Sequence, residues 1–267
     1  MSKPVSPMTI SATQTVKRLL DGPPDAARLE QAFRHLAKWR SELISNTLVG
    51  RSGTKVTSGP FRGMDYPVRA SEGSRAARLL GSYESSLAPV IEEIVTKAYP
   101  VIIDVGSAEG YYAVGLARRL PNARVLARDA NPKAQVLCAA LAAANGVADR
   151  VEVGGLMDHA DFDLCHAQKT LVVCDIEGAE AELLDPVLAP GLAAADILVE
   201  AHDCMRPGLS GVIAERFKAT HNIRVIGRRL DDSGLPDWME GLSDLDRLVA
   251  LWEWRSGPTP WLWMVKK

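Results

Sequence analysis

Apolar residues recur along this chain in two patterns, one typical of amphipathic helices and one of short buried strands. Residues 26–48 carry apolar side chains at helical spacing with charged residues between them, and a shorter helix is expected over 10–20. The Gly- and Pro-containing segment 21–25 separates the two helices. These residues predict a helical hairpin outside the main sheet, which covers the sheet edge, serves as a dimerisation arm, or does both.

Six short apolar segments predict the core strands of one sheet. They lie at 101–105, 123–129, 150–154, 171–175, 196–200 and 222–227. A helix over 133–145, which Gly146 would end, separates the second strand from the third. Strands that alternate with helices in this way build parallel sheets in α/β folds.

The tail predicts an antiparallel hairpin. Its two strands are expected at 248–254 and 261–265, on either side of a Gly-Pro turn. Trp252 and Trp254, like Trp261 and Trp263, have the period-two spacing of one strand face. We expect these tryptophans to pack in the core at the sheet edge.

Residues 101–112 combine a buried strand, a glycine-containing loop and the start of a helix. Gly106 and Gly110 would let the backbone approach a ligand where a Cβ atom would collide. Their spacing is G-x-x-x-G, which differs from the G-x-G-x-x-G that binds a pyrophosphate. Asp104 before the loop and Glu109 within it favour a cofactor that has cationic groups and no phosphate. S-adenosylmethionine fits, because it carries an ammonium and a sulfonium.

Acidic residues and one histidine follow the later strands. Asp129 ends the second strand, where a carboxylate can accept two hydrogen bonds from a ribose diol. Because the carboxyl ends of parallel strands open on one edge of the sheet, several such side chains should meet there. Those expected at this rim are Asp104, Asp129, Asp175, Glu177, Glu200, His202 and Asp203.

Crowded carboxylates raise each other's pKa and increase the proton affinity of an imidazole. Asp175, Glu177, Glu200 and His202 are therefore the candidate catalytic residues, with His202 or Asp175 as the general base for a hydroxyl acceptor. The alternative for His202 is a core histidine that a carboxylate satisfies. A divalent cation on Asp175, Glu200 and Asp203 is possible but not favoured, because a sulfonium cofactor already balances part of the charge.

Three of these segments together resemble class I S-adenosylmethionine-dependent methyltransferases, and within them the FkbM-type family. Residues 101–112 match the glycine-loop motif, 128–130 match the acidic second-strand motif, and 174–180 resemble the D-x-E-G-x-E signature. The similarity covers about residues 80–230. It implies an α/β, Rossmann-like sheet that is mostly parallel with an antiparallel last strand, here with an N-terminal helical extension.

The resemblance also implies where the cofactor binds. Contacts are expected from the glycine loop and the second-strand acid, and Asp175 and Glu177 should face the methyl-transfer site. The cofactor-binding residues implied are Asp104, Gly106, Ser107, Ala108, Glu109, Gly110, Tyr111, Tyr112, Asp129, Ala130 and Asp175.

Composition indicates a globular chain. Its 267 residues, 47% of them hydrophobic, suit one methyltransferase domain over 81–267 and an extension over 1–80. A net charge of −2 argues against nucleic acid or a membrane surface as a partner. No apolar run approaches the roughly 18 residues of a transmembrane helix, and residues 1–20 lack a compact apolar region, so we expect no secretory signal. The four cysteines form no C-x-x-C pair, so we expect a cytoplasmic protein with reduced thiols.

The expected function is methyl transfer from S-adenosylmethionine to a hydroxyl or amine of a small molecule, such as a sugar-type or natural-product intermediate. A nicotinamide-dependent oxidoreductase is one alternative, against which the absence of G-x-G-x-x-G argues. A catalytically inactive, methyltransferase-like scaffold that binds partners through its N-terminal helices is another. A homodimer through the same helices is possible.

Overall fold

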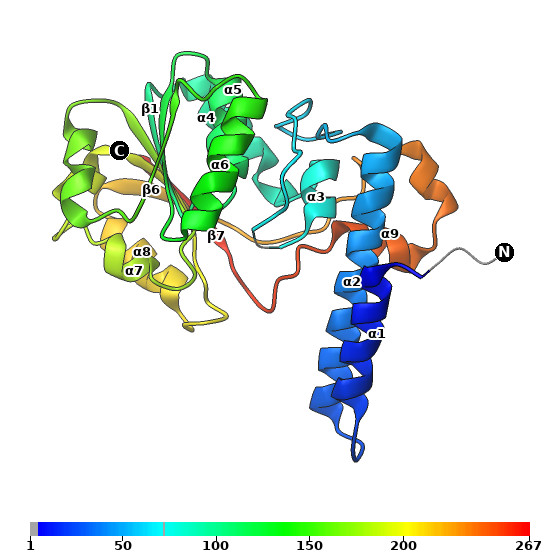
Figure 1. Ribbon diagram of the computed structural model, residues 1–267. Helices are drawn as coiled ribbons and strands as arrows, with labels where there is room; N and C mark the ends of the chain where they lie inside the picture. Colours follow the sequence, from blue (N-terminus) through cyan, green and yellow to red (C-terminus); the bar gives the residue numbers. More distant parts are fainter. Residues whose placement is uncertain (1–4, 72) are drawn as a thin grey trace.

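A seven-stranded mixed sheet forms the centre of the molecule (Figure 1). The computed structural model describes residues 5–71 and 73–267. The strands are β1 (Val101–Val105), β2 (Arg124–Arg128), β3 (Val151–Gly154), β4 (Thr170–Cys174), β5 (Asp196–Glu200), β6 (His221–Ile226) and β7 (Trp261–Lys266). The six expected core strands are all present, with bounds within one residue of those predicted.

The strand order is β3-β2-β1-β4-β5-β7-β6. Strands β1 to β5 pair in parallel, whereas β7 lies antiparallel between β5 and β6. The sheet is therefore mostly parallel with a reversed last strand, and this confirms the Rossmann-like fold class. In the register, Val105 pairs with both Arg128 and Cys174, so β1, β2 and β4 end level and their following loops begin at one edge.

Helices cover both faces of the sheet. One face carries α4 (Ala88–Lys97), α5 (Tyr111–Arg119) and α6 (Pro132–Ala144), and the other carries α7 (Glu180–Leu183) and α8 (Leu209–Phe217) (Figure 1). The connections contain the 3₁₀ helices η1 (Ser85–Leu87), η2 (His159–His166), η3 (Pro190–Ala194) and η4 (Asp237–Gly241). Because successive strand residues point to opposite faces, Ile102 packs into the first of the two cores and Ile103 into the second.

The predicted tail hairpin is wrong in its first half. The helix α9 (Asp244–Leu251) replaces the first strand, and the Ser243 side chain caps it by accepting a hydrogen bond from Asp246 N. Its apolar residues follow helical rather than strand spacing, with 249–251 buried at its end. Trp252 and Trp254 consequently lie outside the strands, whereas Trp261 and Trp263 are buried on β7, as expected.

The N-terminal hairpin consists of α1 (Pro7–Leu20) and α2 (Ala26–Ser52) and stands out from the sheet (Figure 1). Its tip lies outside the core, as expected, and leaves Leu29 and Phe33 60% and 65% exposed. The second half of α2 packs against α9 and α3 (Arg75–Leu80). Ile44 of α2 belongs to the same buried cluster as the helices on the first face of the sheet. The core therefore continues into the N-terminal extension.

The four cysteines are free thiols. Cys138, Cys165 and Cys174 are buried, and Cys204 is exposed. Among residues 5–71 and 73–267, no helix is both long and apolar enough to cross a membrane.

Candidate active site

A cavity of about 980 Å³ lies at the edge where the parallel strands end. Its walls come from the loops after β1 to β5 and from the segment 253–259 that precedes β7. Five residues from earlier in the chain also line it, namely Lys38, Ser71, Gly73, Arg78 and Tyr83. This volume is at the upper end of the range for small-molecule sites. The residues expected from the sequence that line it are Gly106, Ala108, Asp129, Ala130, Asp175, Glu177, Glu200 and His202.

Other expected cofactor residues lie behind the cavity wall. They are Asp104, Ser107, Glu109, Gly110, Tyr111 and Tyr112. Glu109 is fully buried, where it accepts hydrogen bonds from the Tyr66 hydroxyl at 2.6 Å and Ser71 N at 2.8 Å. Arg78 pairs with the same carboxylate at 2.8 Å. Glu109 therefore anchors the segment that contains these three residues against the glycine loop.

The two tyrosines that follow the loop also pack inward. The Tyr111 ring makes edge-on contacts with Phe61, Tyr66, Tyr83 and Tyr112, with centroids 5.3–5.9 Å apart. The Tyr112 hydroxyl donates a hydrogen bond to a different buried acid, Glu84. These tyrosines fix the start of α5 and have no surface in the cavity.

The two loop glycines are required by contacts within the protein. A Cβ atom on Gly106 would lie 1.7 Å from the carbonyl oxygen of Asp175, and one on Gly110 would lie 2.7 Å from Sγ of Cys138. Both have positive φ angles, +78° and +93°, which glycine adopts without strain. A Cβ atom at these two positions would therefore collide with the loop after β4 and with α6, rather than with a ligand as the sequence predicted.

Asp129 joins two loops at the cavity. Its Oδ2 accepts a hydrogen bond from Ala108 N at 2.8 Å, and its Oδ1 accepts one from Asn131 N at 2.7 Å. A carboxylate has about four acceptor sites, so sites remain for a ligand. The backbone of Asp129 bonds to Gly154, which brings the apolar residues Leu156 and Met157 beside it.

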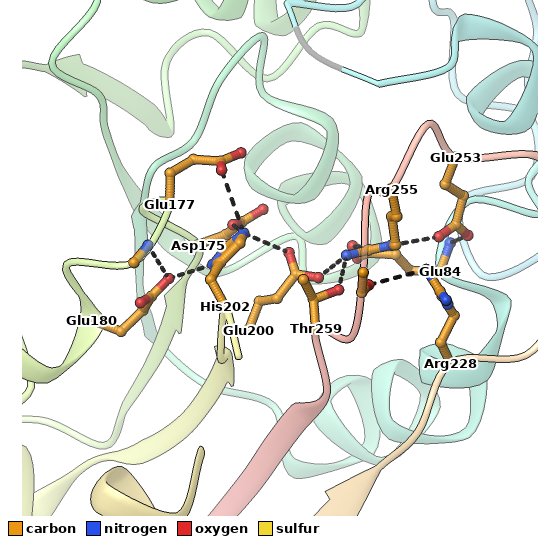
Figure 2. Close-up of polar contacts among 12 residues, drawn as sticks. Glu84, Asp175, Glu177, Glu180, Glu200, His202, Arg228, Glu253, Arg255 and Thr259 are labelled. Carbon is orange, nitrogen blue, oxygen red and sulfur yellow. Dashed lines mark hydrogen bonds and ion pairs between the residues drawn. The ribbon is translucent and has the colours of Figure 1, made fainter. Parts of the chain in front are cut away.

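His202, two residues beyond β5, lies at the centre of a carboxylate cluster (Figure 2). Its Nδ1 is 2.5 Å from Oε1 of Glu180, which is fully buried. Its Nε2 is 3.6 Å from Asp175 Oδ1, 3.7 Å from Glu177 Oε2 and 3.8 Å from Glu200 Oε2. The structure therefore orients the ring through Glu180 and turns its other nitrogen toward three carboxylates.

Arg255 forms a second charged cluster beside the first (Figure 2). Its guanidinium pairs with Glu84 and Glu200, and its Nε lies 2.7 Å from Glu253 Oε2. Thr259 accepts a further hydrogen bond at 2.5 Å. Glu200 joins the two clusters, because Oε1 binds Arg255 while Oε2 faces the histidine.

Burial and charge shift the proton affinities of these groups. Burial, and then the charge of Glu84, raise the pKa of Asp175 to about 7 and that of Glu253 to about 8. Burial lowers the pKa of His202, but its hydrogen bond to Glu180 and the charge of Asp175 raise it by more, so the net shift is upward. Neighbouring carboxylates thus add to burial in raising the pKa of Asp175 and Glu253, and they raise the pKa of the imidazole against the effect of burial.

Asp104 lies on β1 beneath this cluster and is 3% exposed. Burial, and then the charge of Asp175, raise its pKa to about 7. Its Oδ2 has no hydrogen-bond partner within the part of the chain that the structure describes. Asp104 therefore lies behind the cavity wall and does not line the cavity.

Asp203 does not reach the rim where the sequence predicted it. Its two oxygens accept hydrogen bonds from Ser210 N and Ser210 Oγ at 2.8 and 2.7 Å, so it caps the first turn of α8. The cation site considered from the sequence therefore lacks this ligand.

Several site residues, Glu180, Glu84 and Arg255 among them, received no role from the sequence. Glu180 is the last acid of the D-x-E-G-x-E run, and this position was the only pattern that pointed to it. Glu84 and Arg255 are 171 positions apart and meet only in the folded chain. No local pattern identifies such a pair.

Backbone strain concentrates around the site. Four of the five non-glycine residues with positive φ among those described are Glu84, Ala108, Glu177 and Trp254, at 50°, 47°, 56° and 69°. Ala108, Glu177 and Trp254 line the cavity, and Glu84 supports Arg255. Such conformations cost about 1–3 kcal/mol each and cluster at functional sites.

No family model and no curated protein match this sequence. Among solved structures, it is similar to the O-methyltransferase from Bacillus cereus in complex with SAH, at 14% identity and a TM-score of 0.46, over 96% of this chain and 97% of that one. It is also similar to the O-methyltransferase TomG from Streptomyces achromogenes in complex with SAM, at 14% identity and a TM-score of 0.46, over 96% of each chain. The fold assignment rests on the strand order, and membership of the FkbM-type family stays a prediction.

Proposed function

We propose that this protein is an S-adenosylmethionine-dependent methyltransferase that acts on a small molecule. The observation that carries the proposal is the composition of one cavity. It has an acid, Asp129, at the end of β2 and a cluster of acids around His202 at the ends of β4 and β5. The first suits a ribose, and the second suits cationic groups and a methyl acceptor.

The cavity fits this cofactor. Asp129 retains acceptor sites for two ribose hydroxyls, and Leu156 and Met157 offer an apolar wall beside it for an adenine. Further along, Asp175 and Glu177 provide negative charge for the ammonium and sulfonium. The volume of about 980 Å³ leaves room for an acceptor next to the cofactor.

S-adenosylmethionine supplies a methyl group on a positively charged sulfur. The chain has to hold a nucleophile in line with that group, so its contribution is mainly positioning. Asp175, Glu177 and Glu200 surround the place where the acceptor would lie, together with His202. A hydroxyl acceptor has to lose its proton there, whereas an amine would be held by the same carboxylates.

The acceptor side of the cavity includes Lys38, Tyr83 and Trp254. The ammonium of Lys38 lies 4.8 Å from the Trp254 ring centre. Aromatic faces beside acidic and basic groups suit a polar small molecule with a planar or ring portion. Sugar-type and natural-product intermediates, which the family resemblance suggested, fit this description.

Calorimetry with the purified chain tests the proposal. We expect S-adenosylmethionine and its demethylated product each to bind at one site, and NAD⁺ to produce no binding heat. Failure of both adenosyl compounds to bind at millimolar concentration contradicts a methyltransferase. Saturable NAD⁺ binding would favour the oxidoreductase instead.

A further inference from the structure

We propose that Asp175, Glu200 and His202 bind a divalent transition-metal cation at the floor of the cavity. Its binding rests on the geometry of these side chains alone. Its role in activating an acceptor rests on the methyltransferase function proposed above. The ligand set differs from the one considered from sequence, because His202 stands in place of Asp203.

The ligand atoms are already close together. One nitrogen or oxygen atom from each of these three residues lies within 4.8 Å of the other two. Nε2 of His202 is 3.6 Å from Asp175 Oδ1 and 3.8 Å from Glu200 Oε2. A cation about 2.1 Å from each ligand keeps ligand atoms roughly 3–3.6 Å apart, so small side-chain movements complete the site.

The environment of His202 independently indicates a ligand on Nε2. The residue is only 5% exposed, and Nδ1 is held by the buried carboxylate of Glu180. Nε2 receives or donates no hydrogen bond within the described ranges, although it faces the cavity wall formed by Asp175 and Glu200. A carboxylate that binds one imidazole nitrogen and so directs the other at a metal is a common arrangement in metal sites.

The charges around Nε2 also favour a cation. Arg255 neutralises Glu200 through Oε1 and leaves Oε2 directed at the histidine. The side chain of Asp175 has no hydrogen bond from any described residue, and Glu177 adds a third carboxylate 3.7 Å from Nε2. A positive charge among these carboxylates reduces their mutual repulsion.

One imidazole and two carboxylates favour Mn²⁺ or Zn²⁺ over Mg²⁺, because imidazole suits transition metals. Three protein ligands leave coordination positions open to a molecule in the cavity. A hydroxyl bound there would lose its proton more readily, because the cation lowers the hydroxyl pKa, and the carboxylate of Glu177, which is not a ligand, would accept that proton. His202 would then serve as a ligand rather than as the general base expected from the sequence.

Titration of the chelator-treated, full-length chain with MnCl₂ tests the site, without S-adenosylmethionine present. Calorimetry and electron paramagnetic resonance should report one bound Mn²⁺. His202→Ala and Asp175→Asn should each weaken binding by more than about 100-fold, and Glu180→Gln by roughly 10–100-fold. Asp203→Asn and the exposed His166→Ala should bind Mn²⁺ like the parent.

Thermal melts establish that each variant is folded, and His202→Gln replaces His202→Ala if the latter is not. No Mn²⁺ or Zn²⁺ binding at millimolar concentration overturns the proposal, as does parental affinity in the folded His202 variant. Mn²⁺ binding by a chain that does not bind S-adenosylmethionine supports the cation site and contradicts the methyltransferase. S-adenosylmethionine binding by a chain that binds no metal supports the methyltransferase and contradicts the cation site.

Discussion

Arg255 and Glu200 form an ion pair in which only one carboxylate oxygen of Glu200 is used. The other oxygen faces Nε2 of His202 at 3.8 Å. Arg255 also binds Glu253 within its own segment and Glu84, the residue that precedes η1. The arginine therefore joins the segment before β7 to the end of β5 and to the segment before α4. The orientation of a candidate catalytic acid therefore depends on a residue from a distant part of the chain.

Replacing Arg255 by Met should destabilise the protein by about 3–5 kcal/mol, because Glu84, Glu200 and Glu253 would remain buried without their cation. Urea denaturation at pH 8 measures the loss. The double variant Arg255→Met/Glu253→Gln should regain part of it. An unchanged midpoint for Arg255→Met would show that the three carboxylates do not depend on this guanidinium.

Asp129→Ala should weaken S-adenosylmethionine binding by about ten- to a hundredfold, because hydrogen bonds to a charged acceptor are lost. Asp129→Asn, which keeps one acceptor oxygen, should lose less. Calorimetry compares both with Asp149→Ala, an exposed acid outside the cavity. Equal affinity in a folded Asp129→Ala protein would remove this residue from the cofactor site.

Asp175→Asn should lower turnover on a confirmed acceptor by at least about tenfold, and it should lower S-adenosylmethionine affinity by a smaller factor. The substitution keeps the side-chain volume and removes the charge that faces His202. The exposed Asp163→Asn is the matched control. Turnover within a factor of about two of the parent contradicts the catalytic assignment.

Asp104→Asn should change how stability depends on pH. The folded pKa of Asp104 is raised to about 7, so between roughly pH 4 and 7 the folded state holds a proton that the unfolded state releases. The parent therefore loses stability as pH rises through this window, because Asp104 loses its proton. The variant has no such group at this position, so its stability does not fall for this reason. The free energy of unfolding of Asp104→Asn, relative to that of the parent, should therefore rise by on the order of 2–4 kcal/mol between about pH 4 and 7 and stay constant above pH 7.

Denaturation curves at pH 5, 6, 7 and 8 measure this difference, with Asp149→Asn as the exposed control. A constant difference across the series would place the Asp104 pKa near its ordinary value.

Gly106→Ala should destabilise the protein by more than about 3 kcal/mol, because the added Cβ atom meets the Asp175 carbonyl and the φ angle is positive. Gly146→Ala is the matched control. Its φ is +66°, but the space around it is open, so only backbone strain of about 1 kcal/mol is expected. Equal losses in the two variants would show that contact with the Asp175 carbonyl contributes nothing.

The sequence by itself determined the sheet and the neighbourhood of the site. Short apolar segments specify strands through local periodicity, and strands that alternate with helices run parallel. All their carboxyl ends then share one edge, so Asp129, Asp175 and Glu200 meet there whatever the details of packing. This topological rule explains why the acids after three separate strands could be assigned to one cavity.

Only the tertiary structure decided which neighbouring side chains face the cavity. Glu109 turns inward because Tyr66, Ser71 and Arg78 bind it, and Asp203 turns away because Ser210 does. These contacts join residues that are 7 to 43 positions apart. Periodicity indicates which face of an element is apolar. It does not indicate whether a carboxylate will bind a protein group or face the cavity.

The tail shows the same limit. The alternation of Trp252 and Trp254 suits a strand, yet the residues before them fold as α9 because α2 and α3 offer a surface for its apolar face. Strand β7 then enters the sheet between β5 and β6, and the irregular segment before it brings Arg255 to Glu84 and Glu200. Long-range packing, which no local pattern records, therefore completed both the sheet and the charged centre of the site.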